Sequence, residues 1–499
     1  FCCGTMPFIP DDDTKTKLTP EDFDLKKGVD VTPEDRFANF KLEDKWAVLL
    51  FIAHLFVTLA YGLGGIIFYE FVSDKSTIVL PFTNQDIALC ASVMAVSFLI
   101  GCFFAVFFYL FTLKKPVLLI KVAFLLYAAV LIAGAGLFLL IAFISGSIFL
   151  VIIAVLEFLF VIIMVVCLFF FRKTFALTAT YLKIAAGIMG QFKGMIFALI
   201  LGIVVYGVFA VFWVTAFSFT FYYGNPWIYC IGGIWMIFSW FWTTQAITGT
   251  IRVCVAGVVG RWYYQDNVSS AKTVIDAFKT ACFKSIGSVC FGSLITAILA
   301  TISAIFRILY AINRAARPQN ILQCIIKMFV GCFLLCFYVI FARLTHLLKF
   351  FNTYAYTFIA IYGLKFTKAG YATAKLLVTN GLEAIFNHVS MGIIVFSEVL
   401  TIGFVSVLCS TAILLFVEYA ISEVSSNVWV ASEVLSLLLA LGVGMISTEI
   451  INYCIPAVLV CSAHDPSLME SKCPELLQMI KTKFPGIRMF QDSHTHHVQ

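Results

Sequence analysis

Apolar runs of about 20 to 30 residues recur along most of the sequence, and they constrain the fold more than any other feature. About 20 consecutive apolar residues are needed for a helix to cross the hydrocarbon core of a bilayer. A membrane barrel would instead show segments of about ten residues in which apolar and polar positions alternate. Because 62% of the residues are hydrophobic and only 12% are charged, an ordinary soluble domain is excluded as well. The sequence therefore predicts an all-α, polytopic membrane protein.

Ten candidate membrane spans can be placed along the chain, with boundaries good to several residues. They cover about 45–69, 87–113, 117–143, 147–171, 194–222, 226–258, 284–312, 320–346, 385–417 and 429–460. Three more amphipathic segments are expected to lie along the membrane interface: 172–193, 261–283 and 347–384.

Composition divides the chain into three expected parts. These are a disordered tail over residues 1–44, the ten-helix transmembrane domain over 45–460, and a second polar tail over 461–499. If the first tail lies in the cytosol, the inside connections hold most of the connecting Lys and Arg residues. The outside connections then hold only Lys75, Arg314 and Arg317. Both termini are therefore predicted to be cytosolic.

The formal charge of +6 is spread along the flanks of the spans, so no nucleic-acid partner is expected. The expected surroundings are the lipids of the plasma membrane, with an organellar membrane as the alternative. The 16 cysteines include no pair with CxxC spacing. No nucleotide-binding loop, metal-ligand cluster or nucleophile elbow is found in the sequence. We therefore predict no cofactor, no metal and no enzymatic activity.

One apolar segment carries an unusual polar and aromatic stripe. Seven residues recur at alternating steps of three and four and share an arc of roughly 100° on a helical wheel: Trp235, Phe238, Trp242, Gln245, Gly249, Arg252 and Ala256. One interpretation is a packing seam, in which Gly249 and Ala256 admit a neighbouring helix and Gln245 bonds across it. The other is the wall of a cavity, in which Trp235, Phe238 and Trp242 hold a quaternary ammonium against their faces.

Aromatic rings alone would bind such a cation too weakly. Each ring contributes roughly 0.5 to 2 kcal/mol, whereas micromolar to millimolar affinity needs roughly 4 to 8 kcal/mol. A carboxylate inside the membrane could supply the rest, and the candidates are Glu157, Glu398 and Glu449, each inside a predicted span. The alternative is that each is protonated or paired with a nearby cation, namely Arg307, Lys327 or Arg343. His54, in the first span, is interpreted as a core histidine with its hydrogen bonds satisfied.

Four stretches carry a resemblance to a known family. They are FWTTQAITGTIRVCVAGVVGRWYY at 241–264, SIGSVCFGSLI at 285–295, FNTYAYTFIAIYGLKF at 351–366 and VLVCSAHD at 458–465. In this order they resemble the choline transporter-like family, and the third stretch is similar to its fungal and protist branch, the pH-nine-sensitive proteins. The resemblance implies ten spans, two cytosolic termini, and movement of choline or ethanolamine across a membrane for phospholipid synthesis, in exchange for protons.

The sequence departs from the animal members of that family at three positions. Gln245 stands where they tend to have an acidic residue, Arg252 where a neutral polar residue or His is usual, and Pro456 where an acidic residue is expected. Arg252 lies about two turns from the predicted cytosolic end of its span, so its side chain can extend to the interface.

Our interpretation is a gradient-driven carrier. Trp235, Phe238 and Trp242 offer ring faces to the cation, Gln245 orients a hydroxyl, and one of the three carboxylates balances the charge. An ion channel and a scaffold or accessory subunit with membrane-protein partners are the alternatives. A lipid-synthesis enzyme using His464 and Asp465 or the terminal histidines is a weaker one, because the sequence offers no carboxylate at ligand spacing there.

Overall fold

The computed structural model describes most of the chain. The described residues are 37, 40–67, 84–119, 172–220, 226–266, 269–318, 320–420, 424 and 426–483, with isolated positions between 121 and 162. Every regular element within them is a helix, and seven helices in this part of the chain are long and apolar enough to cross a membrane. The predicted all-α, multi-pass architecture is therefore confirmed. The count of ten stays a prediction, because the spans at 117–143 and 147–171 fall mostly outside the described residues.

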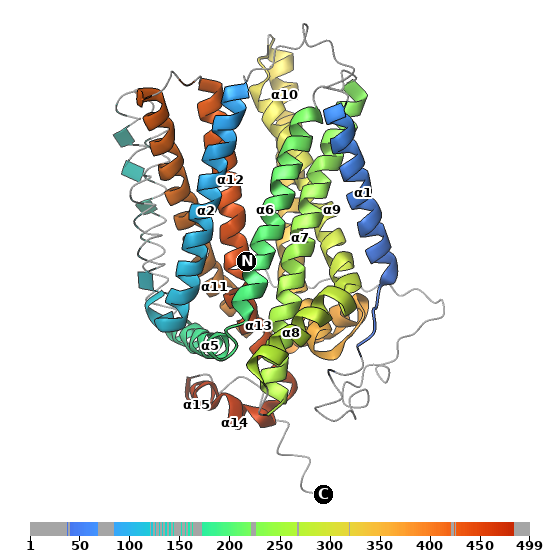
Figure 1. Cartoon of the computed structure of the whole chain (residues 1–499), viewed down its shortest axis with the longest axis vertical. Coiled ribbons are helices and arrows are strands. Elements are labelled where there is room, and N and C mark those ends of the chain that lie inside the picture. Colours follow the sequence, from blue (N-terminus) through green and yellow to red (C-terminus); the bar gives the residue numbers. More distant parts are fainter. Residues whose placement is uncertain are drawn as a thin grey trace, which may run out of the picture.

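Figure 1 shows the helices coloured in the order of the sequence. Their bounds are α1 Lys45–Ile67, α2 Asn84–Lys114, α5 Arg172–Gln191, α6 Met195–Thr220, α7 Pro226–Tyr264, α8 Ser270–Lys279, α9 Ile286–Ala315, α10 Ile321–Tyr362, α11 Phe366–Ala420, α12 Ser426–Ser447, α13 Glu449–His464, α14 Met469–Lys472 and α15 Pro474–Lys483. A π-helical turn, Thr280–Lys284, joins α8 to α9, and a 3₁₀ turn, Pro466–Leu468, precedes α14.

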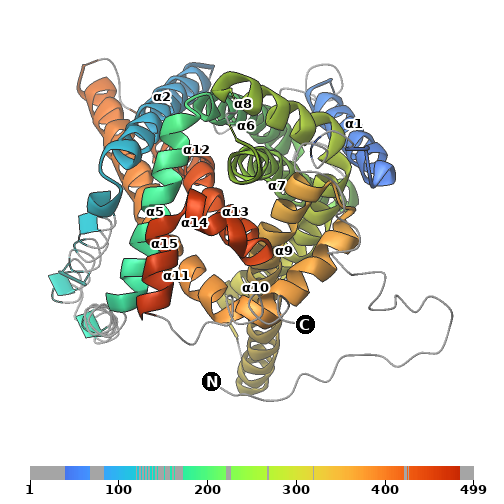
Figure 2. The ribbon, with the colours of Figure 1, turned by 90° about the horizontal axis from the view of Figure 1, so that it is seen from below.

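Helix α7 occupies the middle of the bundle. It packs against α6, α9, α10 and α13, and the view along the bundle shows α7 and α13 surrounded by the other helices (Figure 2). A second group, α2, α11 and α12, packs together beside them. Helices α5 and α8 lie across one end of the bundle, close to α14 and α15 (Figures 1 and 2). We call this end the base.

Residues 347–362, the first part of the interfacial segment expected at 347–384, belong to a helix that enters the protein core. Helix α10 continues to Tyr362, and Gly363 ends it with a φ of +64° that glycine adopts without strain. Helix α11 then starts at Phe366. Residues 352–361 are buried inside the bundle, so this segment packs in the protein core. An amphipathic pattern is also what a helix shows when one face is buried in the core and another faces water at the membrane edge.

The residues just before α1 are fastened to the base. The Asp44 carboxylate accepts hydrogen bonds from the Ser288 hydroxyl at 2.7 Å and from the Phe366 backbone N–H at 2.9 Å. The Phe37 ring lies 4.7 Å from the Arg261 guanidinium carbon. Helices α7, α9 and α11 are thereby linked through one short segment.

The chain remains packed beyond the predicted end of the transmembrane domain at residue 460. Helix α13 runs on to His464, and Met469, Cys473 and Leu476 are buried in the core. Lys472 forms an ion pair with Asp266 at 2.7 Å. The described residues next to both termini thus lie at the base, as expected if both termini are on the same side of the membrane.

Candidate functional site

The polar residues of α7 are largely satisfied within their own helix. The hydroxyl of Thr244 donates to the carbonyl of Trp240 at 2.7 Å, and that of Thr248 donates to the carbonyl of Thr244 at 3.0 Å. Thr250 does the same with Ala246 at 2.9 Å. Such back-bonding lets a hydroxyl sit in an apolar helix without an outside partner. The side chains of α7 that reach other helices include the aromatic rings, Ser239 and Arg252.

The predicted stripe on α7 faces different neighbours along its length. A Cβ added to Gly249 would lie 2.8 Å from the Val289 side chain and 3.4 Å from the Tyr356 ring, so α9 and α10 approach closely here. Ala256 is fully buried. The packing-seam interpretation is therefore correct for this part of the stripe. Further from the base, the stripe contacts α1 through Trp242. Nearer the base, it contacts α13 through Arg252.

Three rings of α7 converge on one residue of α1. The imidazole centroid of His54 lies 4.6 Å from the ring of Trp242, 5.6 Å from Trp235 and 5.7 Å from Phe238. Phe51, one turn earlier on α1, adds a fourth ring at 5.6 Å. We call these five side chains the ring cluster. The structure thus brings together the three rings that the sequence assigned to the site, and it packs them around an imidazole.

The expectation for His54 is half right. The residue is buried, with 3% of its surface exposed, but neither ring nitrogen has a hydrogen-bond partner within the described residues. The carbonyl of Phe51 approaches the imidazole without reaching hydrogen-bond geometry. A buried polar group without a partner costs about 1 to 3 kcal/mol. His54 is therefore a core histidine whose hydrogen bonds are unsatisfied.

The two tryptophans of the ring cluster are anchored by their indole N–H groups. Trp242 donates to the Cys290 carbonyl of α9 at 3.2 Å. Trp235 donates to the Thr58 hydroxyl of α1 at 3.1 Å, and Thr58 donates in turn toward the His54 carbonyl and the Ser239 hydroxyl. These bonds fix the ring planes and engage both indole N–H groups.

A crevice between α1 and α7 leads toward the ring cluster. Its volume is about 370 Å³, and it is lined by Val57, Tyr61, Trp227, Ile228, Ile231, Gly232 and Trp235. The Trp227 and Ile231 side chains are exposed on the outside of the bundle. Because α7 ends at the base, these residues from its first turns place the crevice in the opposite half of the bundle (Figure 1). Trp235 belongs to both features and separates the crevice from His54.

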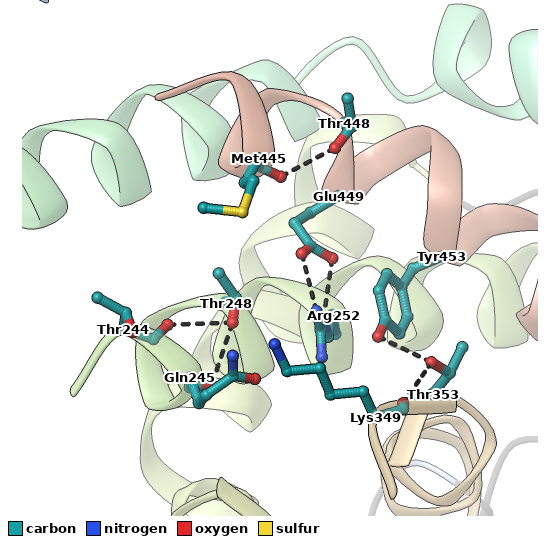
Figure 3. A network of polar contacts seen from close by, with 10 residues as sticks. All are labelled: Thr244, Gln245, Thr248, Arg252, Lys349, Thr353, Met445, Thr448, Glu449 and Tyr453. Atoms are coloured by element: carbon teal, nitrogen blue, oxygen red, sulfur yellow. Dashed lines mark hydrogen bonds and ion pairs between the residues drawn. The ribbon is translucent and has the colours of Figure 1, made fainter. Parts of the chain in front are cut away.

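A charged network lies further toward the base (Figure 3). Arg252 makes two parallel hydrogen bonds to Glu449 of α13, at 2.9 and 2.8 Å, and both side chains are nearly buried. The guanidinium carbon lies 4.5 Å from the centre of the Tyr453 ring, whose hydroxyl is 3.0 Å from that of Thr353. The prediction that Arg252 extends to the interface is therefore wrong. Glu449 attracts the guanidinium into the bundle.

The same network corrects the pairing expected for Glu449. The candidate partners were Arg307, Lys327 and Arg343, but its carboxylate is bound by Arg252. Lys327 instead donates to the backbone carbonyls of Arg314 and Ala316.

Two further polar side chains approach this ion pair. Lys349 extends from α10 toward Gln245 and Arg252 (Figure 3). For the Gln245 amide, no hydrogen bond is found among the described residues, so the expected bond across the seam is not seen. Two cations and one carboxylate leave a positive surplus, which opposes an organic cation at this level.

The remaining predicted carboxylates lie apart from the ring cluster. Glu398 on α11 is 3% exposed, and one of its oxygens accepts a 3.2 Å hydrogen bond from Ser447. Its other oxygen has no partner in the described part of the chain. Glu157 lies outside the described residues.

Lys349, Tyr453 and the unsatisfied state of His54 were not predicted from the sequence. Opposite charges within two predicted spans were a signal for the Arg252–Glu449 pair.

A comparison with known families decides the kind of protein. The family described as plasma-membrane choline transporter has a sequence model that matches residues 155–467. The match covers more than half of the chain and contains all four motif stretches. The chain belongs to the choline transporter-like family. It is therefore a multi-pass integral membrane protein, and the family is described as one of plasma-membrane transporters. This membership points to a transporter rather than an enzyme.

Individual members of the choline transporter-like family share about a quarter of their residues with the chain over the matched part. A protein named PNS1 from Mycosarcoma maydis is 29% identical over 265 residues, which is 51% of this chain and 46% of that protein. PNS1 from Debaryomyces hansenii is 24% identical over 333 residues, covering 63% of each chain. A CTL-like protein from Dictyostelium discoideum is 24% identical over 318 residues, or 63% of this chain and 53% of that one. The chain thus spans about half the length of several curated relatives that it matches.

Proposed function

We propose that this protein is a gradient-driven carrier of choline or a related small amine such as ethanolamine, supplying phospholipid synthesis. The observation that carries the proposal is the convergence of Trp235, Phe238 and Trp242 on the buried His54 imidazole, next to the crevice that Trp235 also lines. Ring faces attract a quaternary ammonium, which is weakly hydrated and needs no hydrogen-bond acceptor. Because a primary ammonium must lose three hydrogen bonds to water there, we favour choline over ethanolamine.

The substrate would enter the ring cluster when α1 and α7 separate. The crevice already divides these two helices above Trp235. Gly232 lets the Tyr61 side chain approach the α7 backbone closely, so the upper halves of both helices can close onto each other. In alternating access, α1 and α7 would separate at the crevice to admit the substrate from one side of the membrane. The helices would separate at the base to release it on the other side.

Charge balance separates the roles of the three predicted carboxylates. Glu449 is engaged by Arg252, so it is poorly available to a substrate cation. Glu398 has no ion partner within the described residues, and it can exchange a proton without first breaking an ion pair. We therefore propose Glu398 as the proton-coupling group. Gln245 follows Trp242 by one turn and would bound the substrate site toward the charged network. Glu157 stays a predicted site residue.

Uptake of labelled choline into proteoliposomes tests the proposal. The parent protein is expected to accumulate choline above empty vesicles, and an opposing proton gradient is expected to increase the uptake. Trp242→Ala should raise the half-saturating choline concentration, because it removes one ring and an anchored contact. Glu398→Gln should retain choline binding and abolish the response to the proton gradient.

Two outcomes would contradict this function. If the parent protein accumulates neither choline nor ethanolamine, the substrate assignment fails, and a scaffold or accessory role becomes the better explanation. Large unitary currents in a planar bilayer would instead identify an ion channel. A response to the proton gradient that survives Glu398→Gln would remove Glu398 from the coupling step.

A further inference from the structure

We propose that His54 is the residue that recognises the hydroxyl group of the substrate, so that the ring cluster selects a quaternary ammonium alcohol. This inference rests on the proposed function and assigns a residue that lies outside the stripe on α7. It also transfers to His54 the hydroxyl contact that the sequence analysis gave to Gln245.

The hydrogen-bonding state of His54 is the first observation. Its imidazole is almost completely buried, yet neither nitrogen is bonded within the described residues. A neutral imidazole carries one donor and one acceptor. The nearby hydroxyl of Thr58 is already committed to the His54 carbonyl, Ser239 and the Trp235 indole. Apart from the Phe51 carbonyl, which approaches without hydrogen-bond geometry, no partner for this imidazole is found in the described part of the protein. A small hydroxyl-bearing guest could provide one.

The position of His54 among the rings is the second observation. Trp242, Trp235 and Phe238 surround the imidazole at centroid distances of 4.6 to 5.7 Å. A hydroxyl placed against the imidazole would carry the attached ammonium into contact with these ring faces. Rings can hold the cation but offer no hydrogen bond to the hydroxyl, because both indole N–H groups are bonded elsewhere. His54 supplies the hydrogen bond to the hydroxyl that the rings cannot make.

The route to His54 is the third observation. The α1–α7 crevice ends on Trp235, whose other side contacts the imidazole. Rotation of the Trp235 ring would break its bond to Thr58 and join the crevice to the ring cluster. Gln245 lies beyond Trp242, toward Lys349 and Arg252 (Figure 3), where the positive surplus opposes the ammonium.

Competition binding on the purified full chain in detergent micelles tests this assignment. Labelled choline is displaced by unlabelled choline or by ethyltrimethylammonium, which has the same cationic head and lacks only the hydroxyl. The parent protein is expected to prefer choline by about 3- to 10-fold, as one hydrogen bond allows. In His54→Phe this preference should vanish while ethyltrimethylammonium binds as before. His54→Gln should restore part of the preference.

Two variants serve as controls. His346→Phe makes the same change at a histidine on the exposed face of α10 and should leave the ratio of the two affinities unchanged. Gln245→Leu should affect both ligands alike. Because Phe fits a cluster of rings, His54→Phe is expected to fold, and its melting temperature checks this directly.

The outcomes distinguish this assignment from the proposed function. A preference for choline that persists in His54→Phe overturns the role of His54, and a preference lost only in Gln245→Leu gives that role to Gln245. Parent protein that binds neither compound overturns the assignment as well. Binding with the expected ratios but without uptake into vesicles would leave the role of His54 intact and refute the carrier function.

Discussion

Arg252 on α7 and Glu449 on α13 face each other through two parallel hydrogen bonds of 2.9 and 2.8 Å, although 197 residues separate them in the chain. The pair lies inside the bundle, with 11% and 8% of the two side chains exposed. Its planar geometry satisfies both carboxylate oxygens, and the Tyr453 ring covers one side of the guanidinium. The pair thereby fixes the central helix α7 to α13.

Removal of either partner of this pair is expected to destabilise the protein. Glu449→Leu leaves the Arg252 guanidinium uncompensated in the bundle, which typically costs about 3 to 5 kcal/mol. Arg252→Met should cost less, because Lys349 still approaches Glu449. The double variant removes both charges and should regain most of the loss, because the desolvation of the ion pair also disappears. Thermal unfolding of the detergent-purified protein measures the effect. A double variant less stable than both single variants would contradict this account.

Gly249 is expected to tolerate no larger residue. Gly249→Ala would place a methyl group 2.8 Å from the Val289 side chain, which is stiff because it is β-branched. The seam between α7 and α9 must then widen, and the melting temperature should fall.

Gly233 is the matched control on the same helix, because a Cβ added there meets no other atom of the described chain within 4 Å. Alanine is favoured over glycine in a helix by up to about 1 kcal/mol. Gly233→Ala should therefore be neutral or stabilising. Equal melting temperatures for the two variants would show that the seam is looser than the described contacts indicate.

Part of this architecture could be predicted from the sequence. Long apolar runs identify helices because the backbone in a bilayer has no other way to satisfy its hydrogen bonds. Helical periodicity also placed Trp235, Phe238 and Trp242 on one face correctly, since that relationship is local to α7. Gly249 was correctly identified as a point of close approach for the same reason.

What lies opposite that face could not be predicted. Whether a ring meets lipid, a cavity or another side chain depends on which helix is its neighbour, and a periodic pattern does not identify neighbours. His54 looked like an ordinary core residue because its surroundings come from α7. For the same reason, Arg252 was not among the three cations considered as alternative partners of Glu449. Residues 347–362 were misread because burial at the base and attachment to an interface give the same amphipathic pattern.

Asp44 is expected to stabilise the base through its carboxylate. One oxygen receives both the Ser288 hydroxyl and the Phe366 N–H, the latter at the first residue of α11. Asp44→Ala removes both bonds, and the loss of such a cap typically costs about 0.5 to 2 kcal/mol. Hydrogen exchange should accelerate in the first turns of α9 and α11 without changing at the top of the bundle.

Asp44→Asn provides the control for this prediction. Asn retains an oxygen that can accept both bonds, and it tolerates the backbone φ of +50° found at this position. Exchange in Asp44→Asn should remain close to that of the parent protein. Equal acceleration in both variants would mean that the negative charge, and not the two hydrogen bonds, holds the segment in place.

Cys473 is expected to be unreactive toward maleimides in the folded protein. It lies after the last membrane-spanning helix and is 2% exposed, and this burial raises the pKa of its thiol from 9.0 to about 12. The reactive species is the thiolate, which is therefore scarce at pH 8. Because an unfolded thiol ionises near pH 9, the contribution of this burial to stability is complete below pH 9 and is lost as the pH rises toward 12.

Ser471→Cys introduces a matched reporter two residues away, on the exposed side of α14. Trypsin cleavage after Lys472 separates Cys473 from the introduced thiol. The peptide with the introduced thiol, 376–472, also holds Cys409, Cys454 and Cys461, so its label is assigned from fragment spectra and by comparison with the parent protein. The introduced thiol should be labelled rapidly at pH 8, and Cys473 only after denaturation. Equal labelling rates in the native protein would show that residues 469–477 detach from the bundle, because a buried thiol can react only when its cover opens.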